Sequence, residues 1–207
     1  MRRVMIVAIG ALIAACSPPA GNSGQAAAQS AGGGEAAYLE RCVEEMVAQN
    51  PQAQRWAPDE CAQRWQAVVA AGPLAEAILA AAAGTPPSGN RLGRDLAIQS
   101  DRVARTVTFS WGEAGAMIPY DAVGALRERG ADVTMIGCSQ LGTGEFNKAY
   151  RVTPHAGAPF QISIYDRMAP TANASSFYNV TVNLNGQVQT LAQLRTDGME
   201  WTERCAY

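Results

Sequence analysis

The spacing of apolar residues changes near residue 85, and this change constrains the fold more than any other feature. Before it, apolar residues recur at spacings of three and four, as in an amphipathic helix: Leu39, Cys42, Val43, Met46 and Val47. After it, apolar and polar residues alternate, as in a half-buried strand: Val103, Val107, Phe109 and Trp111. Residues 85–90 are all turn formers (TPPSGN). We therefore expect a helical segment over 38–84, a linker over 85–90 and a second unit over 91–207.

The first unit should contain three helices. The first ends near Asn50, and the second begins at Pro58, because proline suits the first turn of a helix. The inward face of this second helix is predicted to consist of Cys61, Trp65, Val68 and Val69. A third, alanine-rich helix spans 74–83 and stops at Gly84.

The second unit is predicted to be strand-rich with a single helix over 119–129, for which Gly130 is the C-cap. Strands are expected at 103–111, 132–138, 147–152, 160–165, 177–184 and 201–205, and Asn185-Gly186 is a strong hairpin signal. Helices followed by hairpin-linked strands predict an α+β fold with an antiparallel sheet and one packed helix.

The first sixteen residues carry an export signal. Two arginines precede a twelve-residue apolar run over 4–15, which is shorter than the roughly 20 residues that span a bilayer. Ile13-Ala14-Ala15-Cys16 resembles the lipobox of bacterial lipoproteins. The resemblance implies cleavage of residues 1–15, acylation of Cys16 with chains such as palmitate, and a membrane anchor in the cell envelope. Ser17, rather than aspartate, implies the outer membrane, facing the periplasm. An ordinary signal peptide and an uncleaved anchor are the alternatives.

Residues 16–37 are expected to form a lipidated flexible tether, because Ser, Pro, Ala, Gly, Gln and Asn dominate and no apolar period occurs. Fully extended, such a tether reaches about 65 Å.

The other four cysteines form an even set, and an exported protein meets an oxidising compartment, so two disulfides are expected. Four cysteines allow three pairings. Cys42–Cys61 and Cys138–Cys205 are favoured because each pair lies within one segment. A metal site is the alternative, but zinc ligands cluster, and the chain has no CxxC and a single histidine, His155. We therefore expect neither metal nor cofactor.

Net charge argues against a nucleic-acid partner. Loss of residues 1–15 leaves 14 basic and 18 acidic residues, a net charge of −4. No basic stripe remains that could follow a phosphate backbone.

The run Leu141-Gly142-Thr143-Gly144-Glu145 resembles the glycine-rich loop of protein-kinase-like phosphotransferases. The rest of that pattern is missing. Asn147 replaces the third glycine, Gln161 and Ser163 stand near the lysine position, and no H-R-D or D-F-G run follows. We predict a glycine-bearing turn between two strands.

Other catalytic signals are weak. His155 lies in a turn-rich stretch, and no G-x-S-x-G motif accompanies it. Pairs of carboxylates could catalyse hydrolysis, for example Glu113 with Asp121 or Glu145 with Asp166. The sequence does not give the distance between the two carboxylates of either pair. We therefore expect no enzymatic activity.

The preferred binding surface is a sheet edge where strand ends carry residues enriched in binding hot spots: Tyr150, Arg151, Tyr165, Asp166 and Arg167. The alternative is an Asp166–Arg167 surface ion pair beside core tyrosines. Trp56 and Trp65 are expected to fill the helical core.

Three functional hypotheses follow. The leading one is a non-enzymatic, lipid-anchored envelope protein that binds another envelope protein or a cell-wall component. The second is an inhibitor or cofactor of an envelope hydrolase, acting through residues 140–146. The third is an enzyme with a carboxylate or His155 site.

Overall fold

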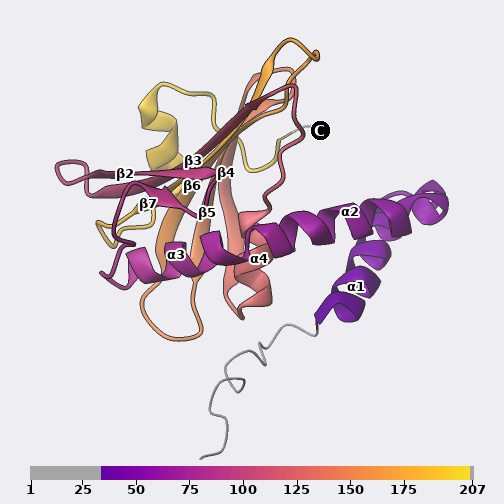
Figure 1. The fold of residues 1–207 in the computed structure, drawn as a ribbon, viewed down its shortest axis with the longest axis horizontal. Helices are drawn as coiled ribbons and strands as arrows, with labels where there is room; N and C mark the ends of the chain where they lie inside the picture. Colours follow the sequence, from indigo (N-terminus) through magenta and orange to yellow (C-terminus); the bar gives the residue numbers. More distant parts are fainter. Residues whose placement is uncertain (1–33, 206–207) are drawn as a thin grey trace, which may run out of the picture.

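In the computed structural model, the described residues 34–205 form three helices followed by a seven-stranded antiparallel sheet (Figure 1). A fourth helix, α4 (Ala122–Glu128), packs on that sheet. The predicted α+β class is therefore confirmed. The predicted signal peptide, Cys16 and residues 16–33 of the predicted tether lie outside the described residues.

The first helix, α1 (Gly34–Gln49), begins four residues before the predicted boundary, so residues 34–37 are helical and do not belong to a tether. Glu35 lies in the first turn, where the helix dipole favours a negative charge, and two alanines follow it. A short 3-10 helix, η1 (Pro51–Arg55), leads into α2 (Ala57–Ala70). The Cys42–Cys61 disulfide joins α1 to α2, as predicted, with Cα atoms 5.9 Å apart.

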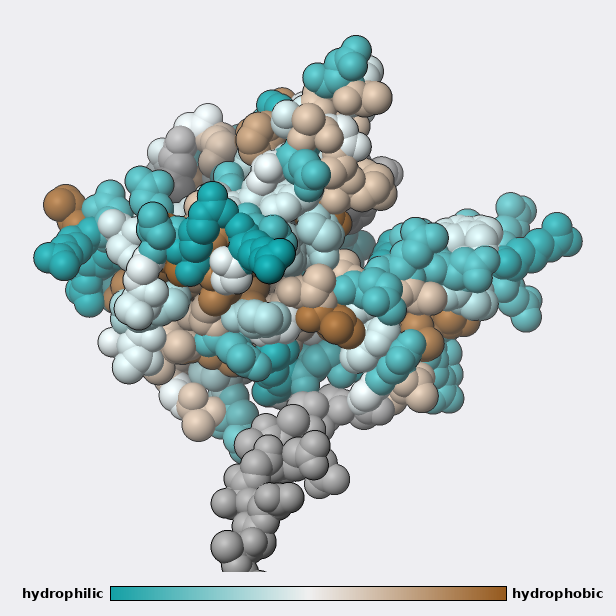
Figure 2. All heavy atoms as spheres, in the orientation of Figure 1, coloured by the Kyte–Doolittle hydropathy of each residue, from teal (hydrophilic) through white to brown (hydrophobic). Residues whose placement is uncertain are grey.

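The α1–η1–α2 hairpin projects beyond the sheet, and its visible surface is mostly hydrophilic (Figures 1 and 2). Two predictions for this region are wrong. Trp56 is exposed at the junction of η1 and α2, and Val69 is exposed because its neighbour Val68 is the residue of that turn that points into the main core. Trp65 is partly buried, and its ring lies 5.1 Å from the ring of Tyr38.

The third helix, α3 (Gly72–Ala82), continues from α2 across a bend of 48°. Within residues 34–205 no single helix is long and apolar enough to cross a membrane, although α2 and α3 together would meet the length and composition requirement.

The strand order in the sheet is β1-β2-β3-β7-β6-β5-β4, and every neighbouring pair is antiparallel. The strands are β1 (Arg91–Leu92), β2 (Leu96–Asp101), β3 (Thr106–Ala114), β4 (Asp132–Gly142), β5 (Glu145–Thr153), β6 (Phe160–Arg167) and β7 (Ser175–Asn183).

The strand predicted over 103–111 begins three residues too early, and β2 was missed. The carboxylate of Asp101 accepts hydrogen bonds from the backbone N–H groups of Val103 and Ala104, which closes a turn there. Val103 therefore lies fully exposed in the β2–β3 connection, and its apolar side chain is not part of the strand pattern.

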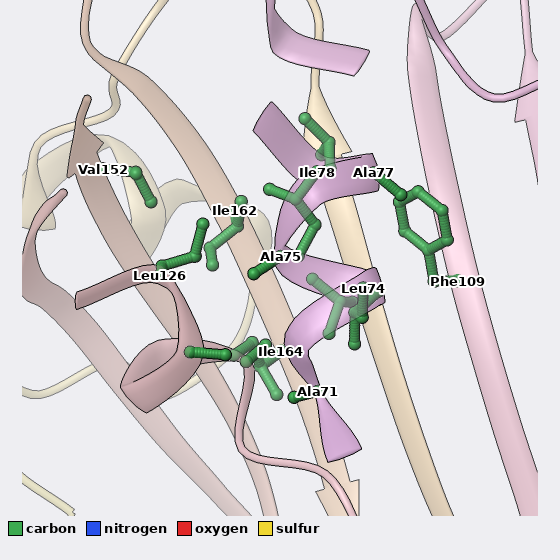
Figure 3. Close-up of a cluster of buried hydrophobic side chains, with 14 of the residues drawn as sticks. Ala71, Leu74, Ala75, Ala77, Ile78, Phe109, Leu126, Val152, Ile162 and Ile164 are labelled. Carbon is green, nitrogen blue, oxygen red and sulfur yellow. The ribbon is translucent and has the colours of Figure 1, made fainter. Parts of the chain in front are cut away.

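The main core lies between α3, α4 and one face of the sheet (Figure 3). Leu74 and Ile78 of α3 are completely buried, as are Phe109 of β3 and Ile162 of β6. Burial of each such side chain contributes about 1.5–3 kcal/mol relative to an exposed one. We call the sheet face toward α3 the inner face and the opposite one the outer face.

The C-terminal segment covers part of the outer face. After β7 the chain forms α5 (Leu191–Leu194) and η2 (Arg195–Asp197), so Asn185-Gly186 does not join two strands. Leu194 and Trp201 pack there against Ala149. The predicted strand over 201–205 reduces to one bridge, in which Thr202 and Cys138 exchange two backbone hydrogen bonds of 2.8 Å.

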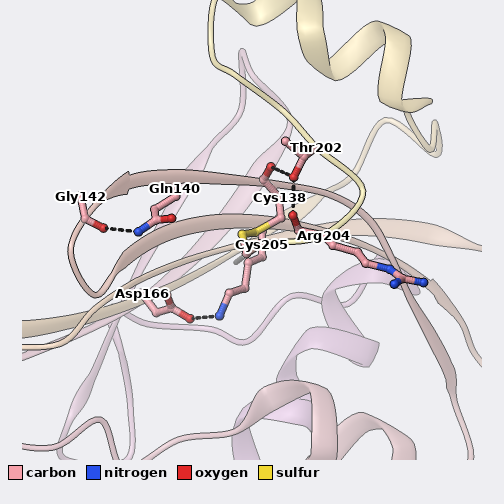
Figure 4. The surroundings of a disulfide bond; sticks show 8 residues. Cys138, Gln140, Gly142, Asp166, Thr202, Arg204 and Cys205 are labelled. Atoms are coloured by element: carbon pink, nitrogen blue, oxygen red, sulfur yellow. Dashed lines mark hydrogen bonds and ion pairs between the residues drawn. A yellow bond between two sulfur atoms is a disulfide. The ribbon is translucent and has the colours of Figure 1, made fainter. Parts of the chain in front are cut away.

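The second predicted disulfide, Cys138–Cys205, fastens this segment to β4 (Figure 4). Its Cα atoms lie 5.6 Å apart, and Cys138 is fully buried. Because β4 is an edge strand, the bridge and the disulfide cover part of an otherwise unpaired edge.

Candidate interaction site

Three connections gather at one end of the sheet, shown uppermost in Figure 1: residues 143–144 between β4 and β5, 168–174 between β6 and β7, and 115–121 between β3 and α4. We call this region the loop end. The Met168 N–H donates to the Gly144 carbonyl at 3.0 Å, and the Gly115 N–H donates to the Ala174 carbonyl at 2.7 Å. These bonds tie the connections to one another.

Exposed large apolar side chains concentrate at the loop end. Among residues 34–205 it holds four of the seven such side chains: Met117, Leu141, Met168 and Phe177. Trp56, Val69 and Val103 are the other three, and they lie elsewhere in the fold. Single exposed apolar residues are ordinary, whereas several together are typical of an interaction surface.

The five residues of the predicted binding surface do not form one surface. Residues 165–167 lie at the loop end, but Tyr150 and Arg151 pair with residues 162 and 161 at the other end of the strands. Tyr150 is buried in the core. The predicted location at a sheet edge is also wrong, because β5 and β6 are interior strands.

Tyr165 and Arg167 both lie on the outer face at the loop end. The Tyr165 hydroxyl donates to the carboxylate of Glu145 at 2.7 Å. Burial raises the pKa of Tyr165, and the neighbouring Glu145 raises it further, so the hydroxyl stays protonated and remains a donor. The Arg167 guanidinium lies 4.7 Å from the centre of the Phe177 ring and donates to the Ser175 carbonyl at 3.3 Å. An arginine stacked on a partly exposed aromatic ring is a frequent anchor of protein interfaces.

Asp166 lies on the inner face and pairs with Lys148, with Nζ 2.8 Å from Oδ2. The alternative Asp166–Arg167 pair does not form. Burial raises the pKa of Asp166, although the Lys148 ammonium opposes this effect. Sequence reasoning missed Lys148. It could have been noticed as a charged residue at an inward-facing position of a strand in which apolar and polar residues alternate. Because both side chains are largely shielded from water, the pair belongs to the structure of the sheet and offers little contact area to a partner.

The glycine-rich run at 141–145 forms the tight β4–β5 turn, as predicted. Gly142 pairs with Glu145, and Gly144 has a φ of +69°, a conformation that glycine adopts without strain.

His155 lines a pocket of about 510 Å³ between the C-terminal end of α3 and the β5–β6 connection. The other lining residues in the described chain are mainly apolar, with Arg129 among them and neither a carboxylate nor a serine. This pocket therefore lacks the acid or nucleophile with which His155 could form a hydrolytic pair.

Three of the four carboxylates in the predicted pairs have defined partners. Asp121 caps α4 by accepting a hydrogen bond from the Gly124 N–H at 2.9 Å, so its role is structural. Glu145 and Asp166 bind different partners on opposite faces of the sheet. Within residues 34–205, no group of three or more His, Cys, Asp or Glu side chains is placed to hold a metal ion.

Comparison of the chain with protein families, with curated proteins and with solved structures gives no match.

Proposed function

We propose that this protein is a lipid-anchored lipoprotein of the cell envelope, without enzymatic activity, that faces the periplasm and binds another envelope protein or a cell-wall component. The lipobox at Cys16 supports the anchor, and Ser17 supports the outer membrane. The observation that carries the proposal is that the four cysteines of residues 34–205 are all joined in disulfides, because such bonds persist in oxidising compartments.

The loop end is the contact surface for a protein partner in this proposal. It combines exposed apolar side chains with the Arg167–Phe177 stack, and its three connections are tied by hydrogen bonds. A surface ordered before binding loses little conformational entropy when a partner binds. The loop end also lies far from Gly34, where the chain continues toward the lipid anchor (Figure 1). A partner could therefore reach it without contacting the membrane.

Two experiments test the anchor. Cells that express the protein are labelled with a palmitate analogue, and the label should appear in the wild-type chain and be absent from the Cys16→Ser variant. Thiol counting under denaturing, non-reducing conditions should find both disulfides intact in protein isolated from the envelope. An unlabelled wild-type chain, or free thiols at the four internal cysteines, would count against the proposal.

A photocrosslinking amino acid tests the contact surface. Placed at Met168, it should crosslink to a discrete envelope protein. Placed at Val103, which is also apolar and exposed but lies at the far end of the sheet, it should not. Equal crosslinking at both positions would show that the loop end is not the interface.

Inhibition of an envelope hydrolase is the second candidate, and the braced β4–β5 turn favours it. Exposed Leu141 precedes this turn, and the hydrogen bond to Gly144 holds it in place. If inhibition is the function, Thr143→Asn, which makes the turn Asn-Gly, should retain the hairpin but reduce potency, measured as residual hydrolase activity in envelope extracts.

A further inference from the structure

The outer face of the sheet carries a row of uncharged polar side chains. The strand register places four of them side by side across β3, β7, β6 and β5: Ser110, Asn179, Tyr165 and Asn147. Their neighbours along the strands, such as Tyr178 and Ile164, are buried in the core, so the row faces away from it. Because adjacent strands lie about 4.8 Å apart, the row is about 14 Å long. We call these four residues the neutral row.

Charge is confined to the margins of this face. Beside the neutral row, the next outer-face residues of β3, β7 and β6 are Thr108, Thr181 and Ser163. Across the described strands β2, β3, β7, β6 and β5, the outer face has four charged side chains, all toward strand ends: Asp101, Arg167, Glu145 and Arg151. Two of them border the row, because Arg167 follows Tyr165 along β6 and Glu145 accepts the hydrogen bond of the Tyr165 hydroxyl. The four side chains of the row are themselves uncharged, so a neutral polar partner would lose no ionic hydration along it.

The neutral row also has unused hydrogen-bonding capacity. Within residues 34–205, the side chains of Ser110, Asn179 and Asn147 make no hydrogen bond, and each is partly exposed. By contrast, the neighbouring Thr108 and Thr181 hydroxyls share a hydrogen bond of 2.9 Å. Each asparagine amide offers two donors and an acceptor oxygen. The ring of Phe177 borders the row on β7 and is partly exposed.

We propose that the neutral row binds an oligosaccharide of N-acetylated sugars, the chemistry of a cell-wall glycan. Sugar hydroxyl and acetamido groups are closely spaced donors and acceptors, which Ser110, Asn179 and Asn147 match with uncharged groups of their own. The ring of Phe177, which carries the Arg167 guanidinium 4.7 Å from its centre, borders the row, and its exposed part would contact a sugar ring through dispersion. This inference rests on the proposed periplasmic location, and it names the cell-wall component that the protein would contact.

The test uses the full-length lipidated protein in detergent and two probes, a tetramer of N-acetylglucosamine and purified cell-wall sacculi. The Asn179→Val variant removes both hydrogen-bonding functions from the centre of the row with a side chain that suits a strand. Thr134→Val is the matched control, because Thr134 is exposed on the outer face of β4, away from the row. Thermal melting should show that both variants remain folded.

We expect wild-type protein to bind the tetramer and to sediment with sacculi. Asn179→Val should weaken the Kd for the tetramer about tenfold, and Thr134→Val should change it less than about twofold. Wild-type protein that sediments with sacculi but does not bind the tetramer also supports the inference, for a longer glycan, if Asn179→Val abolishes the sedimentation. Binding to neither probe, or equal affinity in Asn179→Val, would overturn it. Palmitate labelling and crosslinking at Met168 do not depend on Asn179, so failure here would leave the lipid anchor and the protein contact standing.

Discussion

Loss of the Cys138–Cys205 disulfide should destabilise the whole sheet. The bond joins residues separated by 67 positions. In the chain-entropy treatment, a loop of this length stabilises the folded state by about 4 kcal/mol at 25 °C. For a domain of this size each kcal/mol changes the Tm by about 2–4 °C. A Cys138→Ala, Cys205→Ala variant should therefore melt about 8–16 °C below the wild type. Alanine is the appropriate replacement because Cys138 is fully buried.

Circular dichroism during heating and urea titration are suitable assays. The matched control removes the other bond through Cys42→Ala and Cys61→Ala. Because that bond spans only 19 positions, its loss should cost about 3 kcal/mol. The two bonds lie in separate parts of the fold, so their effects should add. A Tm lowered by less than about 2 °C in the first variant would refute the reasoning. It would show that the C-terminal segment opens independently of the sheet.

Three other perturbations have defined outcomes. Trp201→Ala should lower the free energy of unfolding by about 3–5 kcal/mol in urea titrations, because it empties the centre of the C-terminal contact with the outer face. Gly124→Ala should cost about 1–3 kcal/mol in the same assay, since a Cβ there would lie 2.5 Å from Cγ2 of Val68; unchanged stability would mean that α2 and α4 can move apart freely. Burial raises the pKa of Asp166 despite Lys148, so the carboxyl contributes stability that is complete below its unfolded pKa and is lost as pH rises through the folded pKa. From about pH 3 to pH 6 the wild type should therefore lose stability relative to Asp166→Asn, and a relative gain would contradict the desolvation argument.

Local sequence signals predicted most of the fold because they report burial directly. In β7, every second residue from Ser176 to Val182 is buried, so alternation located the strand within two residues at each end. The missed strand β2 shows the limit of this approach. Its last three residues are exposed, and the apolar Val103 in the following turn imitates a strand position. The Asp101 side chain that ends β2 acts through a turn, which periodicity does not detect.

The candidate site was harder to predict because it depends on strand register. Tyr150 and Tyr165 look alike in sequence, each followed within two residues by a charged side chain. The β5–β6 pairing places Tyr150 opposite Ile162 on the inner face, whereas Tyr165 lies opposite Asn147 on the outer face. Shifting the register by one residue would exchange the two faces. No local pattern records that register.

Both disulfides lie outside the main core, which is formed by α3, α4 and the inner face of the sheet. The α1 helix adds no buried residue to the main core, against which its Tyr38 packs, and the C-terminal segment rests on the outer face with a small apolar cluster of its own. A single disulfide fastens each of these segments, whereas α3, α4 and the sheet are held by their buried side chains. The export signal and the paired cysteines are therefore consistent with each other, since both fit a protein that works in an oxidising compartment. In a reducing compartment the protein would lose both bonds and the stability that they contribute to the whole fold, and an oxidising compartment supplies those bonds.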